Sequence, residues 1–429
     1  MSNSKVDKTG AQSRLSTSCI ACGERKFVDV LNLGEQYVID FLDNDQDDSA
    51  SFKAPLDLVL CSACGLVQLR HVVPRDIMYR RYWYRSGISP DMVRELADIA
   101  HSAERLVRLT PGNIVVDIGA NDGTLLRSYG RRDLKLVGFE PAVNLAELAE
   151  DAGLIINDYF NSASFRRLYA NEKARVITAI AMFYDLEDPN SFLRDIKDLL
   201  DPEGIFIVQM NYLGTMLERN TFDNICHEHL AYYSFRTFKH LLEKNGLEAF
   251  DVNLNDVNGG SFRAYIRHKG HTVGGPTTKN VEELVESEIR NGLDGREAYT
   301  RFADNVRAIA KKLHDFIRDE TGKGNKIYVL GASTRGNTIL QYANLNSKLI
   351  VAAADRNPDK WGRKIIGTGI PIISKEEARK RNPAYFLVLP YGFLNEIKSE
   401  EREYLRGNGK LIVPVPVPRI VMENTEYPI

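Results

Sequence analysis

Two imidazoles, a thiol and a carboxylate follow one another in Cys226-His227-Glu228-His229, which closes a polar run that begins at Asn211. Side chains of these types support two kinds of chemistry. Histidine and cysteine bind transition metals, and a histidine beside a carboxylate can transfer protons near neutral pH. The cluster by itself leaves both alternatives open, and the rest of the chain has to separate them.

A zinc site is predicted from other cysteines. Four of the five cysteines form the close pairs Cys19-Ile-Ala-Cys22 and Cys61-Ser-Ala-Cys64, and a glycine follows each pair. Four thiolates at this spacing are typical of tetrahedral Zn²⁺ in a closed, structural site. Two disulfides are the alternative, which a cytosolic chain disfavours.

Metal binding fits the later cluster less well. Cys226, His227 and His229 lie too close in the sequence to ligate one ion easily, and no further histidine or cysteine is near them. We therefore predict an acid/base site at 226–229.

The composition indicates a protein that acts on small molecules. Its 429 residues predict two or three domains, and 27% charged residues with a net charge of -2 give no reason to expect nucleic acid or a membrane as partner. No apolar run approaches the ~18 residues of a spanning helix, and the polar start at 1–16 lacks the apolar core of a signal peptide. We expect a cytoplasmic protein, a monomer or weak homo-oligomer.

A glycine-rich loop predicts a cofactor site. The apolar strand at 113–118 runs into Gly119-Ala-Asn-Asp-Gly123, and a helix starts at Thr124. A strand, loop and helix in this order form the cofactor end of a doubly wound sheet. The next strand ends at Glu140, where a carboxylate suits ribose hydroxyls. The predicted cofactor-binding residues are Asp117, Gly119, Asn121, Gly123, Glu140, Asp158 and Met182.

The identity of that cofactor depends on the loop. The same geometry serves NAD and S-adenosylmethionine, but the loop lacks the three-glycine dinucleotide pattern. It is similar to the first motif of class I methyltransferases, so S-adenosylmethionine is the predicted cofactor.

A second strand, loop and helix follow at 326–343. The loop Gly331-Ala-Ser-Thr-Arg-Gly336 exposes backbone amides at a helix N-terminus, and Ser333, Thr334 and Arg335 add hydroxyls and a cation, so it can hold a diphosphate. The strand at 349–354 ends at Asp355. We predict a degenerate copy of the cofactor fold that binds a sugar nucleotide; a scaffold without ligand is the alternative.

Several motifs in order resemble one family. They are the two cysteine pairs with Cys64-Gly-Leu-Val-Gln68, Asp117-Ile-Gly-Ala-Asn-Asp-Gly123, Gly138-Phe-Glu-Pro141, Asn224-Ile-Cys-His-Glu-His229, Gly259-Gly-Ser-Phe-Arg263, Gly331-Ala-Ser-Thr-Arg-Gly-Asn337 and Asp355-Arg-Asn-Pro358. With them the chain resembles, nearly end to end, sugar C-methyltransferases that modify nucleotide-linked 4-keto deoxysugars, especially at C3. The resemblance implies a zinc-binding domain, an S-adenosylmethionine-binding domain and a third domain that positions the substrate.

The resemblance also implies roles for the cluster. His229 is expected to take the proton from the sugar carbon, because a C–H beside a ketone is acidic when the enolate is stabilised. Glu228 is expected to orient an imidazole or bind a sugar hydroxyl, and His227 to stabilise the oxyanion. Tyr84 ends an aromatic run before Ser86, and we expect these two side chains to face the ligand, although packing at a domain junction is the alternative for the run.

Two positions depart from the family. Many relatives have tyrosine in place of Cys226 and histidine in place of Asp185, which implies a different sugar. The predicted substrate-binding residues are Ser86, Asp185, Asn211, Cys226, Ser261, Arg263, Ser333, Thr334, Arg335, Asn337, Asp355 and Arg356.

The predicted fold class is α/β: a class I methyltransferase sheet with a small zinc-binding domain before it and a Rossmann-like domain after it. The expected segments are a flexible start (1–16), the zinc-binding domain (17–85), the methyltransferase domain (86–275), a helical connector (276–322) and a domain for the sugar nucleotide (323–429). The alternatives to a C3-methyltransferase are an O- or N-methyltransferase, an NAD(P)-dependent sugar reductase and a non-catalytic assembly protein.

Overall fold

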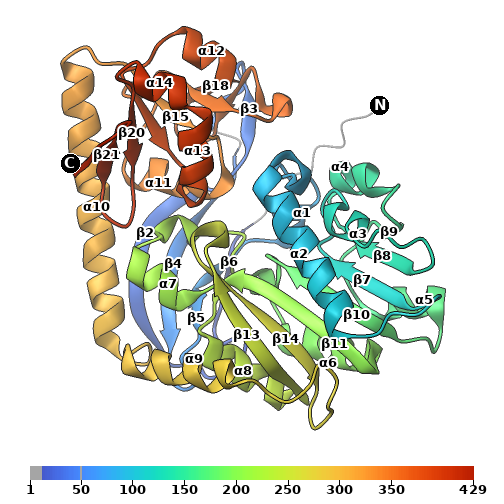
Figure 1. The fold of residues 1–429 in the computed structure, drawn as a ribbon. Coiled ribbons are helices and arrows are strands. Elements are labelled where there is room, and N and C mark those ends of the chain that lie inside the picture. The colour runs from blue at the N-terminus through green and yellow to red at the C-terminus, as the bar shows by residue number, and fades with distance from the viewer. Residues whose placement is uncertain (1–11, 49–50) are drawn as a thin grey trace.

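The computed structural model describes residues 12–48 and 51–429. Most of the segment expected to be a flexible start lies outside these residues. Figure 1 shows the long helix α10 running down one side of the molecule, with the C-terminal sheet above and the methyltransferase sheet below it to the right.

The N-terminal part forms an antiparallel sheet of order β12-β5-β4-β2. Its strands are β2 (Phe27–Tyr37), β4 (Lys53–Cys61), β5 (Val67–Leu69) and β12 (Ala231–Tyr232), and β1 (Arg14–Leu15) pairs separately with β6 (His71–Val72). Leu56, Leu58 and Leu60 alternate along β4 and are buried in the core. Because β12 directly follows the histidine cluster, its pairing with β5 fixes the end of that cluster.

A seven-stranded sheet of order β13-β14-β11-β10-β7-β8-β9 forms the second part. Its strands are β7 (Ile114–Ile118), β8 (Lys135–Phe139), β9 (Leu154–Ile156), β10 (Ala174–Ile180), β11 (Leu200–Asn211), β13 (Leu247–Asn255) and β14 (Ser261–His268). The first five are parallel, and β13 and β14 are antiparallel. The strand order reverses between β7 and β10, where such sheets bind ligands at the carboxyl ends.

Short helices flank this sheet. They are α1 (Arg75–Tyr79), α2 (Pro90–Leu106), α3 (Thr124–Arg127), α4 (Val143–Ala146), α5 (Ser162–Tyr169), α6 (Pro189–Leu199), α7 (Leu213–Arg219) and α8 (Phe235–Lys244). Local sequence explains where α2 and α6 begin. Ser89 and Asp188 accept backbone N–H groups of the first turn, and a proline follows each of them.

The C-terminal sheet has the order β22-β21-β20-β19-β15-β16-β18-β17-β3. Its strands are β15 (Ile327–Leu330), β16 (Ala353–Asp355), β17 (Arg363–Ile365), β18 (Ile370–Ser374), β19 (Tyr385–Val388), β20 (Lys410–Val413), β21 (Arg419–Val421), β22 (Glu426–Pro428) and β3 (Phe41–Asp43). The helices of this part are α11 (Thr334–Tyr342), α12 (Lys375–Lys380), α13 (Leu394–Glu400) and α14 (Arg402–Arg406). Around β15 the strands are parallel, as in a nucleotide-binding fold.

The helical connector expected at 276–322 is broken at 291–295. It forms α9 (Lys279–Arg290) and α10 (Arg296–Gly322). The apolar face of α10 is buried: Phe302, Val306 and Leu313 pack into a core that also contains Leu58 of the N-terminal sheet and Ile339 of α11. The connector is therefore part of a shared core.

Two strands cross the expected domain boundaries. β12 lies in the N-terminal sheet although it belongs to the methyltransferase segment, and β3 pairs with β17 although it belongs to the N-terminal segment. Both strands complete an edge that would otherwise expose unpaired backbone groups. The boundaries expected at 85 and 275 therefore do not separate independent sheets.

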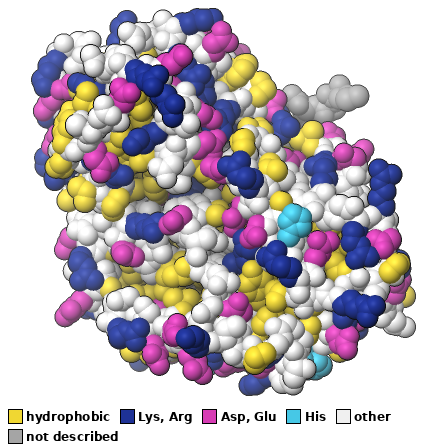
Figure 2. Space-filling view, viewed as in Figure 1, with side chains coloured by type: hydrophobic (Ala, Val, Ile, Leu, Met, Phe, Trp, Pro, Cys, Tyr) yellow, Lys and Arg dark blue, Asp and Glu magenta, His cyan; other side chains and the backbone are white. Residues whose placement is uncertain are grey.

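Among the described residues, every helix is too short or too polar to cross a bilayer. On the face drawn in Figure 2, basic and acidic side chains are interspersed.

Candidate active site

One cavity of about 860 Å³ lies at the carboxyl end of the seven-stranded sheet, and residues of the C-terminal part form one of its walls. Its volume is within the range of small-molecule sites. It collects most of the residues predicted for the site. Those that line it are Tyr84, Ser86, Asp117, Gly119, Asn121, Glu140, Met182, Asp185, Asn211, Cys226, Glu228, His229, Ser261, Ser333, Thr334 and Arg335.

The first glycine loop lines this cavity. Gly119 has a φ of +74°, which lets the backbone turn away from β7. Glu140, at the end of β8, accepts the N–H groups of Asn121 and Ala142, each at 2.8 Å. Burial raises the pKa of Glu140 to about 7. A carboxylate held in this way can receive ribose hydroxyls.

The aromatic run is fastened to the same loop. The Asn121 amide accepts the N–H of Ser86 at 3.0 Å and donates to the carbonyl of Tyr84 at 3.1 Å, while Asp122 accepts the N–H of Gly87 at 2.8 Å. The segment before α2 therefore becomes a wall of the cavity.

Asp117 lies at the end of β7 in a buried position. It accepts the hydroxyl of Thr178 at 2.6 Å, and burial raises its pKa to about 7. Its proton is therefore held near neutral pH unless a ligand donates to it.

Two predicted cofactor residues do not reach the cavity. Gly123 packs against the helix at 143–149, since a side chain there would meet Ala149 and Ala152. Asp158 accepts the N–H of Tyr159 at 2.8 Å. The neighbouring rings of Tyr159 and Phe160 line the cavity in its place.

His229 presents one ring nitrogen to the cavity. Its Nδ1 lies 2.9 Å from the carbonyl oxygen of Asn224. A carbonyl only accepts, so Nδ1 carries the proton and Nε2 keeps its lone pair. The ring lies 4.2 Å from that of Tyr184 and is 7% exposed. Burial, with the nearby charge of Arg335, lowers the pKa of His229 to about 3, which keeps the imidazole neutral.

His227 faces the other way. Its Nε2 lies 2.9 Å from the carbonyl oxygen of Ala54 in β4, and the side chain is 3% exposed outside the cavity. Burial lowers its pKa to about 4. The structure therefore removes it as an oxyanion partner. Two residues that are two positions apart in this irregular segment point to opposite sides.

Two carboxyl groups share the cavity with His229. Glu228 and Asp185 both line the cavity; burial raises the pKa of each, and for Asp185 the charge of Glu228 raises it further. One buried oxygen of Asp185 has no hydrogen-bond partner. Burial also raises the pKa of the Cys226 thiol, so the group is neutral.

Sequence reasoning missed two phenols at this point. Tyr79 and Tyr82 line the cavity, and the Tyr79 hydroxyl donates to the backbone carbonyl of Glu228 at 2.7 Å. Burial together with the nearby carboxyls raises the pKa of both well above its usual value. From this aromatic run the prediction named Tyr84 alone, which also lines the cavity.

Two side chains of the C-terminal part, Arg335 and Tyr391, bond to residues of the methyltransferase part at the cavity. Arg335 donates to the carbonyl of Asn258 at 2.8 Å and to the carboxylate of Asp223 at 2.6 Å, and the Tyr391 hydroxyl donates to the same carboxylate. Although burial alone would lower the pKa of Arg335, the charge of Asp223 raises it. Asp223 and Tyr391 were not predicted, because no local motif links residues that lie so far apart in the chain.

Arg263 is engaged elsewhere. It forms ion pairs with Glu95 at 2.6 Å and Asp98 at 2.7 Å, and its Nε donates to Gln209 at 2.8 Å. The guanidinium therefore fastens α2 to the sheet and does not face a substrate.

Three further predicted substrate residues lie outside the cavity. Asp355 accepts the N–H groups of Ala332 and Asn357 at 2.7 and 2.8 Å. The other two are Arg356, which pairs with Glu396 and Glu400, and Asn337, which is buried within α11. The polar groups of Asp355 and Arg356 serve the C-terminal fold, whereas both polar side-chain atoms of Asn337 are buried without a hydrogen-bond partner.

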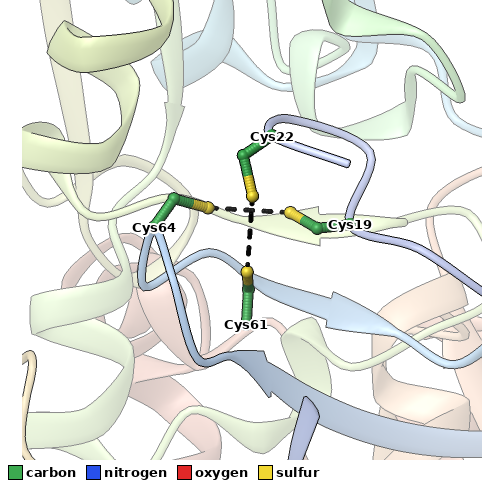
Figure 3. A group of neighbouring side chains, drawn as sticks. All are labelled: Cys19, Cys22, Cys61 and Cys64. Atoms are coloured by element: carbon green, nitrogen blue, oxygen red, sulfur yellow. Dashed lines mark hydrogen bonds between the residues drawn. The ribbon is translucent and has the colours of Figure 1, made fainter. Parts of the chain in front are cut away.

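The four predicted cysteine ligands converge on one point, as Figure 3 shows. The sulfurs of Cys19, Cys22, Cys61 and Cys64 lie within 4.8 Å of one another, with separations of 3.6 Å for Cys19–Cys64 and 3.5 Å for Cys22–Cys61. Ligands of tetrahedral zinc at about 2.3 Å would lie about 3.8 Å apart. The site fits structural Zn²⁺. It packs against the methyltransferase core and is separate from the cavity.

Three family models match the chain in consecutive ranges. Residues 19–79 match "Putative zinc binding domain", residues 91–252 match "Methyltransferase domain", and residues 256–416 match "C-methyltransferase C-terminal domain".

Two relatives and one solved structure show the extent of the similarity. The C-methyltransferase NovU of Streptomyces niveus is 30% identical over 408 residues, which cover 94% of this chain and 96% of that protein. A ubiquinone biosynthesis O-methyltransferase of Azorhizobium caulinodans is 30% identical over 108 residues, 24% of this chain and 42% of the relative. The mitomycin 7-O-methyltransferase MmcR aligns at a TM-score of 0.32 with 19% identity, over 41% of this chain and 53% of that one, which is too distant to inform the site.

The match to NovU extends through the zinc, methyltransferase and C-terminal regions, whereas the O-methyltransferase covers only a short part of the chain. Methylation at oxygen or nitrogen, sugar reduction and a purely structural role are therefore set aside. The chain belongs to the C-methyltransferase family and is an S-adenosylmethionine-dependent C-methyltransferase.

Proposed function

We propose that this enzyme methylates C3 of a nucleotide-linked 4-keto-6-deoxyhexose, and that His229 takes the proton from C3. The observation that carries the proposal is the single cavity onto which Glu140, His229 and Arg335 all open. A methyl donor at one end and an anionic sugar nucleotide at the other would meet at the imidazole.

The proposed reaction requires a base that takes a proton from C3. A C3–H bond beside a C4 ketone is broken when its proton passes to a base, and the electron pair is held by the developing enolate. Neutral His229, with its Nε2 lone pair facing the cavity, is suited to accept that proton. S-adenosylmethionine, when bound, supplies an electrophilic methyl group.

Glu228 is assigned to stabilise the imidazolium that results. The low pKa of His229 makes its protonation costly. Glu228 in its ionised form would offset this cost, because a carboxylate in the same cavity attracts the imidazolium. Tyr79, Tyr82 and Tyr84 are phenols at the same wall, and one of them is assigned to donate to the enolate oxygen.

The sugar-nucleotide end is assigned to the second loop. Ser333, Thr334 and Arg335 lie at the N-terminus of α11 and line the cavity, where a diphosphate would be attracted by the helix end and the guanidinium. The side chains assigned to the sugar itself are Ser86, Asp185, Asn211, Cys226 and Ser261.

This gives a division of labour along the chain. Segment 17–85 holds zinc, and segment 86–275 holds S-adenosylmethionine and the base. Segment 276–322 connects the methyltransferase segment to segment 323–429, which receives the sugar nucleotide. The three family matches support this order.

The test compares two histidines of one motif. His229→Gln should abolish methylation and the exchange of C3–H with D₂O, because no base remains, and should leave S-adenosylmethionine affinity within about twofold by calorimetry. His227→Gln, outside the cavity, should keep most of the activity. Products are followed by mass spectrometry with dTDP- and GDP-linked 4-keto-6-deoxyhexoses that carry a hydroxyl or an amino group at C3.

Undiminished deuterium incorporation at C3 in His229→Gln would overturn the assignment of the base. If the wild-type enzyme methylates no member of the panel, the assignment of the substrate fails.

A further inference from the structure

We propose that helix α11 of the C-terminal part positions the base of the methyltransferase part, by holding the carbonyl group that fixes the tautomer of His229. The inference rests on the proposed role of His229. It gives the C-terminal part a task in the proton transfer in addition to binding the substrate.

The tautomer depends on one backbone group. The Asn224 carbonyl oxygen lies 2.9 Å from His229 Nδ1 and also accepts the Tyr232 hydroxyl at 3.2 Å. Only the tautomer with a proton on Nδ1 satisfies this contact and leaves Nε2 free to accept a proton. If the carbonyl moved away, the proton would no longer be held on Nδ1, and the base would be lost in part of the population.

Asn224 lies in a short, irregular segment, the 3₁₀ turn Phe222–Asn224. Its side chain bonds only locally, to Thr221. A turn of this length has no ladder of backbone hydrogen bonds to fix it, so its position depends on what packs against it.

Both neighbours of Asn224 are held by α11. The carboxylate of Asp223, on one side, accepts from Arg335 at 2.6 Å. The carbonyl of Ile225, on the other side, accepts the hydroxyl of Thr338 at 2.9 Å. Arg335 and Thr338 are three residues apart and therefore share one face of the helix. The two anchors leave the carbonyl between them little freedom.

A change at Thr338 tests the positioning of His229 without altering the residues that line the cavity. It is 3% exposed and lies outside the cavity, so it touches neither cofactor nor substrate. Arg335 and Asp223, by contrast, line the cavity, and a change in either would alter several contacts at once.

The first experiment reads the tautomer directly and needs no substrate. Two-bond ¹H–¹⁵N spectra of the full-length, ¹⁵N-histidine-labelled protein distinguish Nδ1–H from Nε2–H, and the cross-peaks missing in His229→Gln identify His229. The wild-type protein should show Nδ1–H. A wild-type protein with the proton on Nε2 overturns the inference, whatever the substrate of the enzyme is.

The second experiment uses a matched pair at Thr338. Thr338→Val keeps the shape but removes the hydroxyl, whereas Thr338→Ser keeps the hydroxyl. Thr338→Val should populate the Nε2–H tautomer of His229 and lower kcat roughly tenfold with KM within about twofold, and Thr338→Ser should behave as wild type.

A structural role alone would lower thermal stability in Thr338→Val and leave the tautomer and kcat unchanged, which would refute the inference. Should the valine variant not fold, Asp223→Asn gives the same readout, since it weakens the anchor on the other side of Asn224; an unchanged tautomer there also refutes it. Failure of every tested sugar nucleotide would bear on the proposed function only, because the spectra stand without turnover.

Discussion

The chain contains two strand–loop–helix units that are built alike and differ in what surrounds them. Each loop starts with a glycine of positive φ, Gly119 at +74° and Gly331 at +84°. Each is tied down by an acidic residue from the end of the next strand: Glu140 accepts two backbone N–H groups beside the first loop, and Asp355 accepts two beside the second.

The surroundings of the two carboxylates are different. Glu140 faces the cavity. Asp355 faces Lys360, whose Nζ lies 3.6 Å from it and donates to the carbonyl of Ala332 at 2.8 Å. A fixed cation therefore occupies the position that ribose hydroxyls would need.

The glycines differ in the same sense. A side chain on Gly119 would meet the flexible Met182, at 3.3 Å, whereas on Gly331 it would meet the ring of Pro390, at 2.8 Å. The rigid ring of Pro390 therefore blocks the space beside the first glycine of the second loop. The later residues of that loop, 333–335, line the cavity of the first. A shared local pattern thus does not decide which loop holds a cofactor.

The largest effect should separate the two carboxylates. If Glu140 receives the ribose hydroxyls, Glu140→Ala should weaken S-adenosylmethionine binding roughly 100-fold, because the acceptor of these hydroxyls is lost. Asp355→Ala should leave that affinity within about twofold and instead lower the free energy of unfolding by about 1–3 kcal/mol, since Lys360 and two N–H groups lose their partner. Calorimetry and urea unfolding measure the two quantities. Equal losses of affinity would mean that the second loop also holds the cofactor.

A smaller effect should show that the second loop serves the first cavity. Thr334→Val removes a hydroxyl from the cavity wall and should raise the KM of the sugar nucleotide about threefold to tenfold, with the affinity for S-adenosylmethionine unchanged. Arg356→Lys, which alters an ion pair outside the cavity, is the control and should change neither constant. Steady-state kinetics decides; a KM unaffected by Thr334→Val would remove this loop from the substrate site.

The smallest effect concerns pH. Burial raises the pKa of Glu140 from 4.5 to about 7, so the folded protein keeps a proton that the unfolded chain has released in this range. The stabilisation is complete below pH 4.5 and is lost as the pH rises to 7. Glu140→Gln should therefore flatten the decline of the unfolding free energy between pH 5 and 7, by on the order of 1 kcal/mol. Parallel curves for variant and wild type would contradict this.

The fold could be predicted well where local pattern governs it. The buried strand β7, the loop after it and the cysteine pairs are all contiguous motifs, and the structure places them as expected. The β3 and β12 pairings could not be predicted, because each joins a two- or three-residue strand to a sheet formed elsewhere in the chain. Such short strands carry no periodic signal.

The site divides in the same way. Residue type and spacing singled out His229, Glu228 and the first loop, and of these residues His229, Glu228, Gly119 and Asn121 line the cavity. His227 and Arg263 have the right chemistry as well, but Ala54 and the helix α2 engage them outside the cavity. Tyr79, Asp223 and Tyr391 were missed because their partners lie in other segments of the chain.

The sequence by itself determined the parts: a four-cysteine zinc site, two nucleotide-type loops and a histidine–glutamate pair, because each depends on neighbours within a few residues. Only the tertiary structure decided their use. Pro390 and Lys360 occupy the space beside the second loop, and its helix was brought against the turn that holds His229. These contacts join residues far apart in the chain, and packing, which local sequence does not encode, selects among them.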